Sequence, residues 1–354
     1  MSSNRDEIHS DISVILRSAL DELFEESNLR ASEIKKRVEN LNRNYILNKF
    51  NITSEEDALA YALYFLPEHI PKIFFVYSEL LKRFPALLKR IEDVYDLGCG
   101  SGTAGILINL IDPDRKRLFL IDKNPFMLSI AAKILKRIST SEYIIIKADF
   151  LANSPSPKSP SLFLFMNSLS ENRGKAEESI DLVSDLLELN QLNTVIIIEP
   201  IKSESLEMLK RMREIFAEYI LAPCPSPDNC PLSMGTDKIC RFNIRQDISI
   251  QLESVINANH RFAKFCYLVL SRTKKTIDPH LYRVLTYPDR RKYGFDLQIC
   301  NGSEILNVKV LARGGDEKSR LKIISPNDVI KIHNLPSNRS PNINSDDIEI
   351  NKAL

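Results

Sequence analysis

Residues 94–103 read V-Y-D-L-G-C-G-S-G-T, and this stretch decides the fold. A predicted strand ends in Asp96, and alternate glycines then open a predicted helix, namely Gly98, Gly100 and Gly102. Glycine allows tight turning and close approach of the backbone to a ligand. The start of a helix presents free N–H groups to that ligand. The stretch therefore predicts a ligand-binding turn between a strand and a helix.

The acidic residue in front of the glycines indicates which ligand the turn binds. A glycine-rich turn alone is weak support for any one ligand, because nicotinamide-dependent enzymes also use one. The pattern Asp-x-Gly-x-Gly-x-Gly resembles motif I of S-adenosylmethionine-dependent methyltransferases. That ligand carries a cationic sulfonium, so a carboxylate near the turn suits it and would repel a diphosphate.

Two more acidic residues follow predicted strands in the order expected for such a pocket. Asp122 ends the second strand, where a carboxylate can accept hydrogen bonds from both ribose hydroxyls. Asp149 follows the third strand and matches the position that usually touches adenine in this superfamily. We therefore expect S-adenosylmethionine as a cofactor, bound by these two residues, Asp96 and the three glycines. The alternative is a Rossmann-like fold that has lost its ligand.

Predicted strands alternate with predicted helices over residues 91–221. The strands are short apolar runs, which cover residues 94–97, 117–121, 143–148, 162–166 and 194–199. Because helical stretches separate them, the strands should form a parallel sheet covered on both faces. The expected fold class is α/β, a Rossmann-like S-adenosylmethionine-dependent methyltransferase domain with an N-terminal helical segment and a small C-terminal β-rich metal-binding module.

Residues 1–90 form the predicted helical segment. Apolar residues recur at helical spacing over residues 8–23 and 34–45. A third helix starts at Ser54, a candidate N-cap, and Pro67 is expected to end it before a further helix begins. No motif in this segment indicates chemistry.

The C-terminal part is basic, although the whole chain has a net charge of only +1. Residues 222–334 contain 18 Lys and Arg against 11 Asp and Glu and are predicted to form the β-rich module. Such an excess indicates a surface that faces a polyanion. We expect phosphate contacts from four of its arginines, Arg241, Arg245, Arg290 and Arg291. The last segment, 335–354, is polar and aperiodic and is predicted to be disordered.

Composition argues against several other classes of protein. No apolar run approaches the ~20 residues that a membrane-spanning helix needs, so no membrane partner is expected. The N-terminus carries acidic residues and lacks the apolar core of a signal peptide, so we expect a cytoplasmic protein. In a reducing cytoplasm, clustered cysteines are metal ligands or catalytic groups more often than disulfides.

Three of the six cysteines lie in the stretch A-P-C-P-S-P-D-N-C-P-L-S-M-G-T-D-K-I-C. Cys224, Cys230 and Cys240 form an incomplete set, because structural zinc and cubane iron–sulfur clusters normally take four ligands. Cys300 ends a predicted strand at a turn and is the preferred fourth ligand. Cys266 lies in an apolar strand pattern and is expected in the core. Four thiolates suit zinc or iron–sulfur, so the residue types leave the metal open.

Catalytic residues are not identifiable from the sequence. Amino-directed methyltransferases often carry Asn/Asp-Pro-Pro-aromatic after the fourth strand, and Asn167 stands at that place without the prolines. Cytosine-5 RNA methyltransferases use a Pro-Cys nucleophile there, but the Pro-Cys at 223–224 comes a strand and a helix later. The sequence therefore supports a cofactor pocket better than it supports a reaction.

Several blocks of sequence resemble the methyltransferase-like proteins of the small ribosomal subunit, the Rsm-twenty-two-like family. They are V-I-I-I-E-P, A-P-C-P-S-P-D-N-C-P-L, C-R-F, K-F-C-Y-L-V-L-S-R, Y-P-D-R-R and C-N-G, within roughly residues 58–330. The resemblance implies a methyltransferase fold and association with small-subunit rRNA during assembly, and no DNA partner is expected. It also implies a four-iron four-sulfur cluster held by four cysteines, Cys224, Cys230, Cys240 and Cys300.

The chain departs from the family pattern at Ser226, where His is common, at Ile239, where Trp is common, and at Ile201, where Gly is common. These differences affect the surroundings of the cluster more than its ligands. Three functions remain open: an rRNA-binding assembly or translation factor of the small subunit, an active S-adenosylmethionine-dependent rRNA methyltransferase, and a zinc-containing small-molecule methyltransferase. The third explains the basic C-terminal part poorly.

Overall fold

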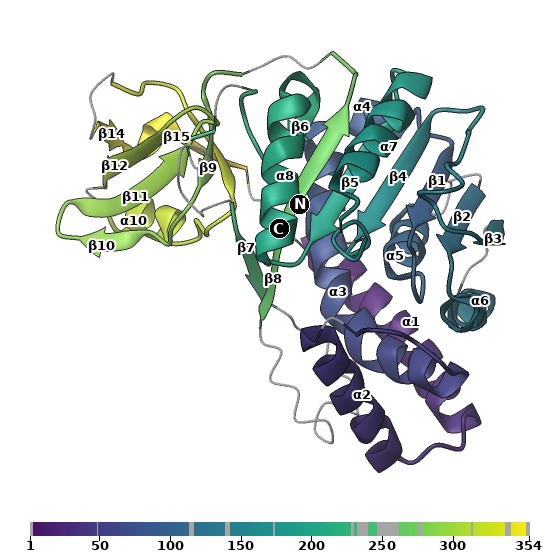
Figure 1. Ribbon diagram of the computed structural model, residues 1–354. Helices are drawn as coiled ribbons and strands as arrows, with labels where there is room; N and C mark the ends of the chain where they lie inside the picture. Colours follow the sequence, from purple (N-terminus) through teal and green to yellow (C-terminus); the bar gives the residue numbers. More distant parts are fainter. Residues whose placement is uncertain are drawn as a thin grey trace.

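Eight strands form a central sheet with the order β3-β2-β1-β4-β5-β8-β6, and β7 pairs with β8 (Figure 1). Strands β1 to β5 run parallel, whereas β8 is antiparallel to β5, β6 and β7. The bounds are β1 Asp93–Leu97, β2 Arg117–Asp122, β3 Tyr143–Lys147, β4 Ser161–Met166, β5 Thr194–Glu199, β6 Ile220–Ala222, β7 Phe242–Arg245 and β8 Phe262–Ser271. This order is that of Rossmann-like folds, extended by an antiparallel strand. The expected α/β fold with a parallel sheet is confirmed.

This computed structural model describes most of the chain. The described residues are 3–47, 49–112, 117–138, 142–172, 174–227, 230–231, 240–245, 262–274, 278–312, 314–336 and 341–351.

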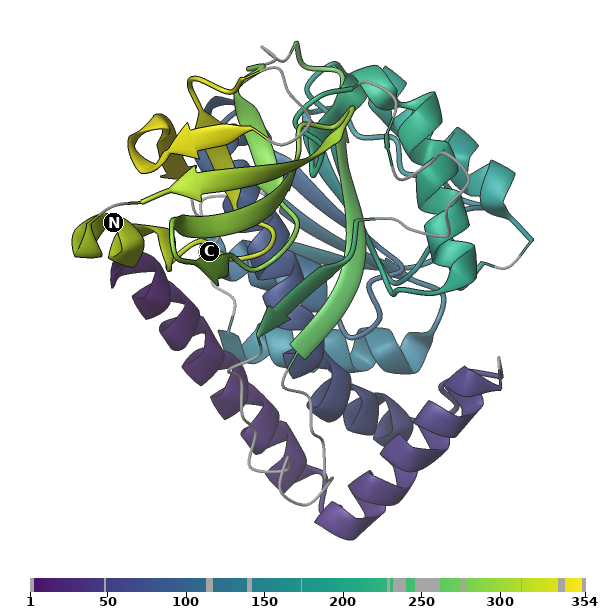
Figure 2. The same ribbon diagram turned by 90° about the vertical axis from the view of Figure 1, so that its left-hand side faces the viewer.

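Helices cover both faces of the central sheet, as the alternating sequence pattern predicts. Helices α3, α5 and α6 share one apolar core with α1 and α2, and helices α7 and α8 belong to a second core. Figure 2 shows α1 and α2 meeting at an angle below the sheet. The bounds are α1 Ser3–Glu26, α2 Ala31–Ile46, α3 Glu55–Arg83, α4 Pro85–Leu88, α5 Thr103–Ile111, α6 Pro125–Ile138, α7 Ala176–Leu189, α8 Ser203–Ile215 and the 3-10 helix η1 Ala217–Tyr219.

Helix α3 is continuous through Pro67 and Pro71, so the prediction that Pro67 ends a helix is wrong. Its N-cap is the expected one, since Ser54 Oγ accepts a hydrogen bond from the N–H of Asp57 at 3.2 Å. An interior proline costs a helix about 3 kcal/mol. Burial of nearly every residue from Ala58 to Leu80 against α5, α6 and β8 offsets that cost. Among the described helices, none is long and apolar enough to cross a membrane.

A second sheet forms the C-terminal module, with the order β14-β12-β11-β9-β13-β15 and with β10 paired to β11. Its bounds are β9 Leu281–Val284, β10 Asp289–Arg291, β11 Gly294–Cys300, β12 Ile305–Leu311, α10 Gly315–Leu321, β13 Val329–Ile332, β14 Asn342–Asn344, η2 Ser345–Asp347 and β15 Ile348–Asn351. Apolar residues of these strands make a core of their own. Figure 1 shows the module beside α8 and β7, at one end of the central sheet.

Two segments differ from the expected domain organisation. The strand Phe262–Ser271 joins the central sheet as β8 instead of the C-terminal module, because its apolar side chains are buried on both faces between β5 and β6. Residues 341–351 lie in the segment predicted to be disordered, yet they contain β14 and β15. Ile343 and Ile348 are buried there, so a few apolar residues among polar ones suffice to attach these short strands.

Candidate cofactor pocket and cysteine site

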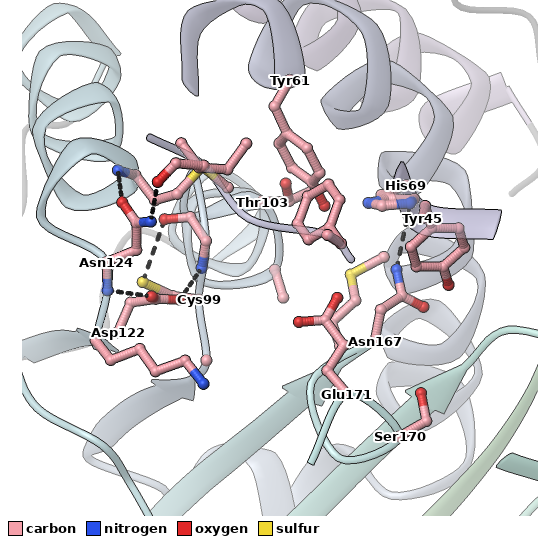
Figure 3. A pocket seen from close by; sticks show the side chains of 18 of the residues that line it. Tyr45, Tyr61, His69, Cys99, Thr103, Asp122, Asn124, Asn167, Ser170 and Glu171 are labelled. Carbon is pink, nitrogen blue, oxygen red and sulfur yellow. Dashed lines mark hydrogen bonds between the residues drawn. The ribbon is translucent and has the colours of Figure 1, made fainter. Parts of the chain in front are cut away.

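A cavity of about 250 Å³ opens at the carboxyl ends of β1, β2 and β4. In open α/β sheets the carboxyl ends of the strands are the usual place for a ligand. Figure 3 shows Asp122 and Asn124 on one side of the cavity and His69, Tyr45 and Asn167 on the other. The pocket therefore lies between the glycine turn of the sheet and the N-terminal helical segment.

The glycine turn is held against the end of β2 by two backbone hydrogen bonds to the carbonyl of Ile121, from Gly98 at 2.8 Å and from Cys99 at 3.1 Å. The three glycines have left-handed backbones, with φ values of 70°, 54° and 84° for Gly98, Gly100 and Gly102. A Cβ atom on Gly98 would lie 2.5 Å from the Cβ of Ser168. Glycine is thus required both by conformation and by the close approach of the loop after β4.

Asp96 lies under the turn, with only 1% of its surface exposed. Its Oδ2 accepts a hydrogen bond from the N–H of Gly105 at 2.8 Å, while its buried Oδ1 has no hydrogen-bond partner in the described part of the chain. Burial raises the pKa of Asp96 to about 7, and the charge of Asp122 adds to this effect. A buried acceptor without a hydrogen-bond donor costs free energy of folding, so Asp96 is suited to a ligand that donates a hydrogen bond or carries a positive charge.

Asp122 uses both oxygens to shape the pocket. Its Oδ2 accepts from the N–H of Gly100 and its Oδ1 accepts from the N–H of Asn124, both at 2.8 Å. Burial raises the pKa of Asp122, although these two N–H groups act in the opposite direction. A carboxylate oxygen can accept a second hydrogen bond. The residue therefore retains acceptor capacity toward ligand hydroxyls.

Asp149 lies in a smaller cavity of about 70 Å³ that adjoins the first one. Gly98, Asp122 and Glu171 line both cavities. The predicted pocket residues are thus brought together in the order of the strands: Asp149 at one end, Asp122 in the middle and Asp96 at the other end. An elongated ligand can span the two cavities in that order.

The N-terminal segment supplies a wall that the sequence did not predict. The main cavity is lined on this side by Tyr45, Phe50, Tyr61 and His69. The ring centre of Phe50 lies 6.0 Å from that of Tyr45 and 5.8 Å from that of Tyr61. Lys202 Nζ lies 3.4 Å from the centre of the Tyr45 ring and so joins this wall to the start of α8. No local pattern identifies such residues, because the helices that carry them meet the sheet only in the folded molecule.

Asn167 follows β4 and occupies the wall opposite Asp122. Its backbone is left-handed, with φ 58°, and its Nδ2 lies 3.2 Å from Nε2 of His69 on α3. Its Oδ1 is buried and has no hydrogen-bond partner among the described residues. The pair places two polar side chains beside the pocket. Asn167 stands where amino-directed methyltransferases often carry Asn/Asp-Pro-Pro-aromatic, and this chain lacks the prolines.

Cys224, Cys230, Cys240 and Cys300 are near one another at the junction of the two sheets. Burial raises the pKa of Cys240, and the charges of the other three thiols raise it further. Burial also raises the pKa of Cys300 to about 11, with smaller contributions from Cys224 and Cys230. Within the residues that the structure describes, no group of three or more His, Cys, Asp or Glu side chains is placed to hold a metal ion.

The turn after Cys300 brings its strand against the proline-rich segment. Gly302 has φ 102°, its N–H donates to Cys300 Sγ at 3.3 Å, and a Cβ atom on it would lie 2.7 Å from the carbonyl oxygen of Ser226. Cys266 lies in β8, where it is 1% exposed and its Sγ donates to the carbonyl of Glu199 at 3.4 Å. The expectation that Cys266 is a core residue is confirmed.

The predicted RNA-contacting arginines lie in two places. Arg241 is exposed next to β7, and the side chain of Arg245 lies outside the described residues. Arg290 and Arg291 belong to β10, at the outer edge of the second sheet (Figure 1). Arg291 pairs with Asp289 at 2.5 Å and with Asp296 at 2.8 Å, whereas Arg290 is exposed and has no ion pair among the described residues. Arg241 therefore does not form one cluster with Arg290 and Arg291.

A family model described as "Mitochondrial small ribosomal subunit Rsm22" matches residues 55–320. The chain belongs to this family. The matched region runs from the start of α3 to α10, so it includes the glycine turn and the four cysteines. It does not include α1 and α2, and therefore not Tyr45. No curated protein matches the chain.

Solved structures that are similar to the chain include three methyl-transferring proteins. A precorrin-6y C5,15-methyltransferase from Geobacter metallireducens GS-15 is 16% identical, with 53% of this chain and 86% of that chain covered and a TM-score of 0.33. An rRNA methylase from Streptococcus thermophilus is 11% identical, with 53% and 92% covered and a TM-score of 0.33. A ribosomal protein L11 methylase from Lactobacillus delbrueckii subsp. bulgaricus is 14% identical, with 58% and 80% covered and a TM-score of 0.33. Membership of the Rsm22 family rests on the family model alone.

Proposed function

We propose that this protein is an rRNA-binding assembly or translation factor of the small ribosomal subunit, and that its pocket binds S-adenosylmethionine. The observation that carries the proposal is Asp96, which lines a cavity beside the glycine turn and whose buried Oδ1 has no hydrogen-bond partner in the described residues. The family match supports the ribosomal partner, because the family is described as belonging to the mitochondrial small ribosomal subunit.

The hydrogen-bond acceptors of the pocket suit this cofactor. Asp149, Asp122 and Asp96 would meet the adenine, the ribose and the cationic amino acid end in turn, in the order in which they line the two cavities. Gly98 and Gly100 line the main cavity, so a ligand there can approach the backbone of the turn closely. When bound, S-adenosylmethionine supplies a methyl group on a positively charged sulfur. Around that charge the chain supplies carboxylates, which stabilise a cation in a partly buried site.

Binding to rRNA would use the C-terminal module. Its β10–β11 hairpin carries Arg290 without an ion pair in the described structure and, close by in sequence, Tyr287 with 70% of its surface exposed. An exposed aromatic ring next to basic side chains suits contact with a nucleic acid, by stacking and by phosphate contact. Arg291 contributes less in this proposal, because Asp289 and Asp296 already neutralise it.

The four cysteines would hold an iron–sulfur cluster, with zinc as the alternative. Supporting this are the mutual electrostatic effects of the thiols and the buried Arg283, which lowers the pKa of Cys240 and Cys300. Burial raises the pKa of Cys224, Cys240 and Cys300, so these thiols ionise poorly until a metal stabilises the negative charge. The described residues do not converge on a metal-binding geometry, so the ligand set is proposed from the residue types and the family resemblance.

An active rRNA methyltransferase is the second candidate, and the Asn167–His69 pair favours it because it lines the pocket wall opposite the glycine turn. No residue of the chain is assigned a catalytic role. A small-molecule methyltransferase with zinc has no observation in its favour beyond the same pocket and cysteines.

One anaerobic preparation tests these proposals together. Calorimetry should detect S-adenosylmethionine binding, and filter binding should detect small-subunit rRNA with an affinity that falls with salt. Iron and sulfide analysis should find both elements in the protein. A protein that binds neither the cofactor nor rRNA would contradict the main proposal, and a colourless protein with stoichiometric zinc would select the alternative metal. Transfer of labelled methyl groups to subunits would establish the second candidate.

A further inference from the structure

Glu171 lies where the main cavity meets the smaller one, and its side chain lines both. Figure 3 shows its carboxylate pointing into the cavity, between Asp122 on one side and His69 on the other. Glu171 is exposed, so a ligand in the cavity can reach it. Among the described residues, no hydrogen bond or ion pair to another side chain fixes its carboxylate. The residue is therefore available to interact with a ligand.

The two cavities carry an excess of negative groups. The charged side chains that line them are the acidic Asp96, Asp122, Asp149, Glu171 and Glu204 and the basic Lys123 and Lys202. The charge of Asp122 repels that of Glu171, whereas Lys123 and Lys202 attract it. The ammonium of Lys202 lies on the Tyr45 ring. The described lining therefore holds five acidic groups against two basic ones, and one of the two basic groups already lies on an aromatic ring.

Asp96 shows independently that the cavity suits a cation. The residue lines the cavity, and its buried Oδ1 has no hydrogen-bond donor in the described part of the chain. Asp96 and Asp122 each have a raised pKa. A positive charge placed among these carboxylates would relieve their mutual repulsion. A neutral ligand of the same shape would not.

We infer that Glu171 is a specificity-determining residue that makes this pocket bind a positively charged ligand more tightly than an uncharged ligand of the same shape. This inference rests on the proposed function, because S-adenosylmethionine and S-adenosylhomocysteine are a pair of this kind. The first has a sulfonium and the second a neutral thioether, while their adenosine and amino acid parts are identical. Hydrogen bonds to Asp122, Asp149 and the glycine turn therefore cancel when the two affinities are compared.

The consequence is regulatory. With this preference the pocket is occupied when the methyl donor is abundant and is emptied more readily when the demethylated product accumulates. Occupancy joins the N-terminal wall, Tyr45 and Tyr61, to the glycine turn across the cavity. An assembly factor with such a pocket responds to the ratio of the two compounds whether or not it transfers the methyl group.

The test compares affinities for the two compounds in the full-length protein, by calorimetry at a pH of about 8, where moderately perturbed carboxylates are ionised. The variant is Glu171→Gln, which keeps the shape and removes the charge. The matched control is Glu178→Gln, which removes a charge from an exposed position at the start of α7 outside both cavities. Thermal unfolding of each variant shows that it folds.

We expect wild-type protein to prefer S-adenosylmethionine, and Glu171→Gln to reduce that preference about fivefold, the size typical of an accessible charge pair. The affinity for S-adenosylhomocysteine should stay the same in all three proteins, and Glu178→Gln should keep the wild-type preference. If both compounds bind and Glu171→Gln leaves their ratio unchanged, the inference is wrong while the proposed function stands. If neither compound binds wild-type protein, the proposed function fails, and the inference with it.

Discussion

The carboxylate of Glu79 on helix α3 and the guanidinium of Arg283 on β9 of the second sheet form an ion pair of 2.5 Å, with each side chain only 2% exposed. Arg283 also donates to the carbonyl of Pro223 at 2.9 Å and to that of Asn327 at 2.7 Å. Tyr267 of β8 donates to the second oxygen of Glu79 at 2.6 Å. One buried arginine thus connects the long helix, the C-terminal module and the residue before Cys224.

This connection predicts a large loss of stability in Arg283→Ala. Removing one partner leaves the Glu79 charge buried with fewer compensating groups, which costs about 3–5 kcal/mol in comparable pairs. Urea unfolding of the full-length protein measures the loss. The control is Arg291→Ala, whose ion pairs with Asp289 and Asp296 are accessible to solvent, so their loss should cost much less stability. Equal losses in the two variants would contradict a structural role for Arg283.

Gly98→Ala should abolish binding of S-adenosylmethionine. The new Cβ would lie 2.5 Å from Ser168 Cβ, so the loop after β4 must move, and φ +70° strains any other residue. Gly174→Ala is the matched control, because its φ is +73° but nothing lies within 4 Å of the added atom. It should lose about 1 kcal/mol of stability and no affinity. Equal affinity losses in the two variants would show that backbone strain alone, rather than the contact with Ser168, is responsible.

Asp96→Asn should change the pH dependence of stability in the unliganded protein. The folded pKa of about 7 is above the ordinary value of 3.8, so folded protein binds this proton more tightly than unfolded protein. The resulting stabilisation is present at about pH 4 and is lost as the pH rises through about 7, with a size of a few kcal/mol. Chemical unfolding from about pH 4 to about pH 8 should therefore show a smaller fall in the variant than in wild type.

Asp96→Asn should also change the affinity of the protein for its ligand. Asn keeps the acceptor for the N–H of Gly105 but cannot carry the negative charge, so affinity for S-adenosylmethionine should fall. A variant with an unchanged pH profile would show that Asp96 has an ordinary pKa. Burial raises the pKa of Glu199 to about 7 as well. Glu199 therefore contributes to the pH dependence of stability in both proteins, and only the difference between wild type and Asp96→Asn reports on Asp96.

Cys300→Ser should lower the iron content of anaerobically purified protein, because serine is a poor ligand for a metal that prefers thiolates. Cys266→Ser is the control, since its side chain lies in the core of β8 and donates to a backbone carbonyl that a hydroxyl can also reach. It should keep the metal and lose about 1–3 kcal/mol of stability. Retention of iron in Cys300→Ser would remove this residue from the proposed ligand set.

Arg290→Ala should weaken rRNA binding and reduce the slope of log affinity against log salt by about 1. Arg291→Ala should have a smaller effect, because two aspartates neutralise Arg291 in the described structure. Filter binding over a range of salt concentrations measures both slopes. If Arg291→Ala reduces the slope as much as Arg290→Ala, the ion pairs of Arg291 with Asp289 and Asp296 break when rRNA binds. If neither variant changes it, the rRNA does not contact β10.

Local patterns in the sequence were sufficient for the five parallel strands β1 to β5 and the glycine turn, but not for the antiparallel strand β8. Alternating apolar and helical stretches predict parallel strands, and alternate glycines after Asp96 predict the turn, because both depend on residues close in sequence. The continuity of α3 through Pro67 was not predictable in this way. It depends on burial against α5, α6 and β8, which outweighs a strong local signal.

The sequence by itself determined which strands are parallel, where the glycine turn lies and which acidic residues end the strands beside it. Only the tertiary structure decided that Tyr45, Tyr61 and His69 face that turn, that Glu171 lies between two cavities, and that Arg283 pairs with Glu79. Residues 204 positions apart in the chain, as in that ion pair, leave no common pattern in sequence. Their contact arises from the packing of one sheet against a helix of the other core, and packing depends on shape rather than on sequence spacing.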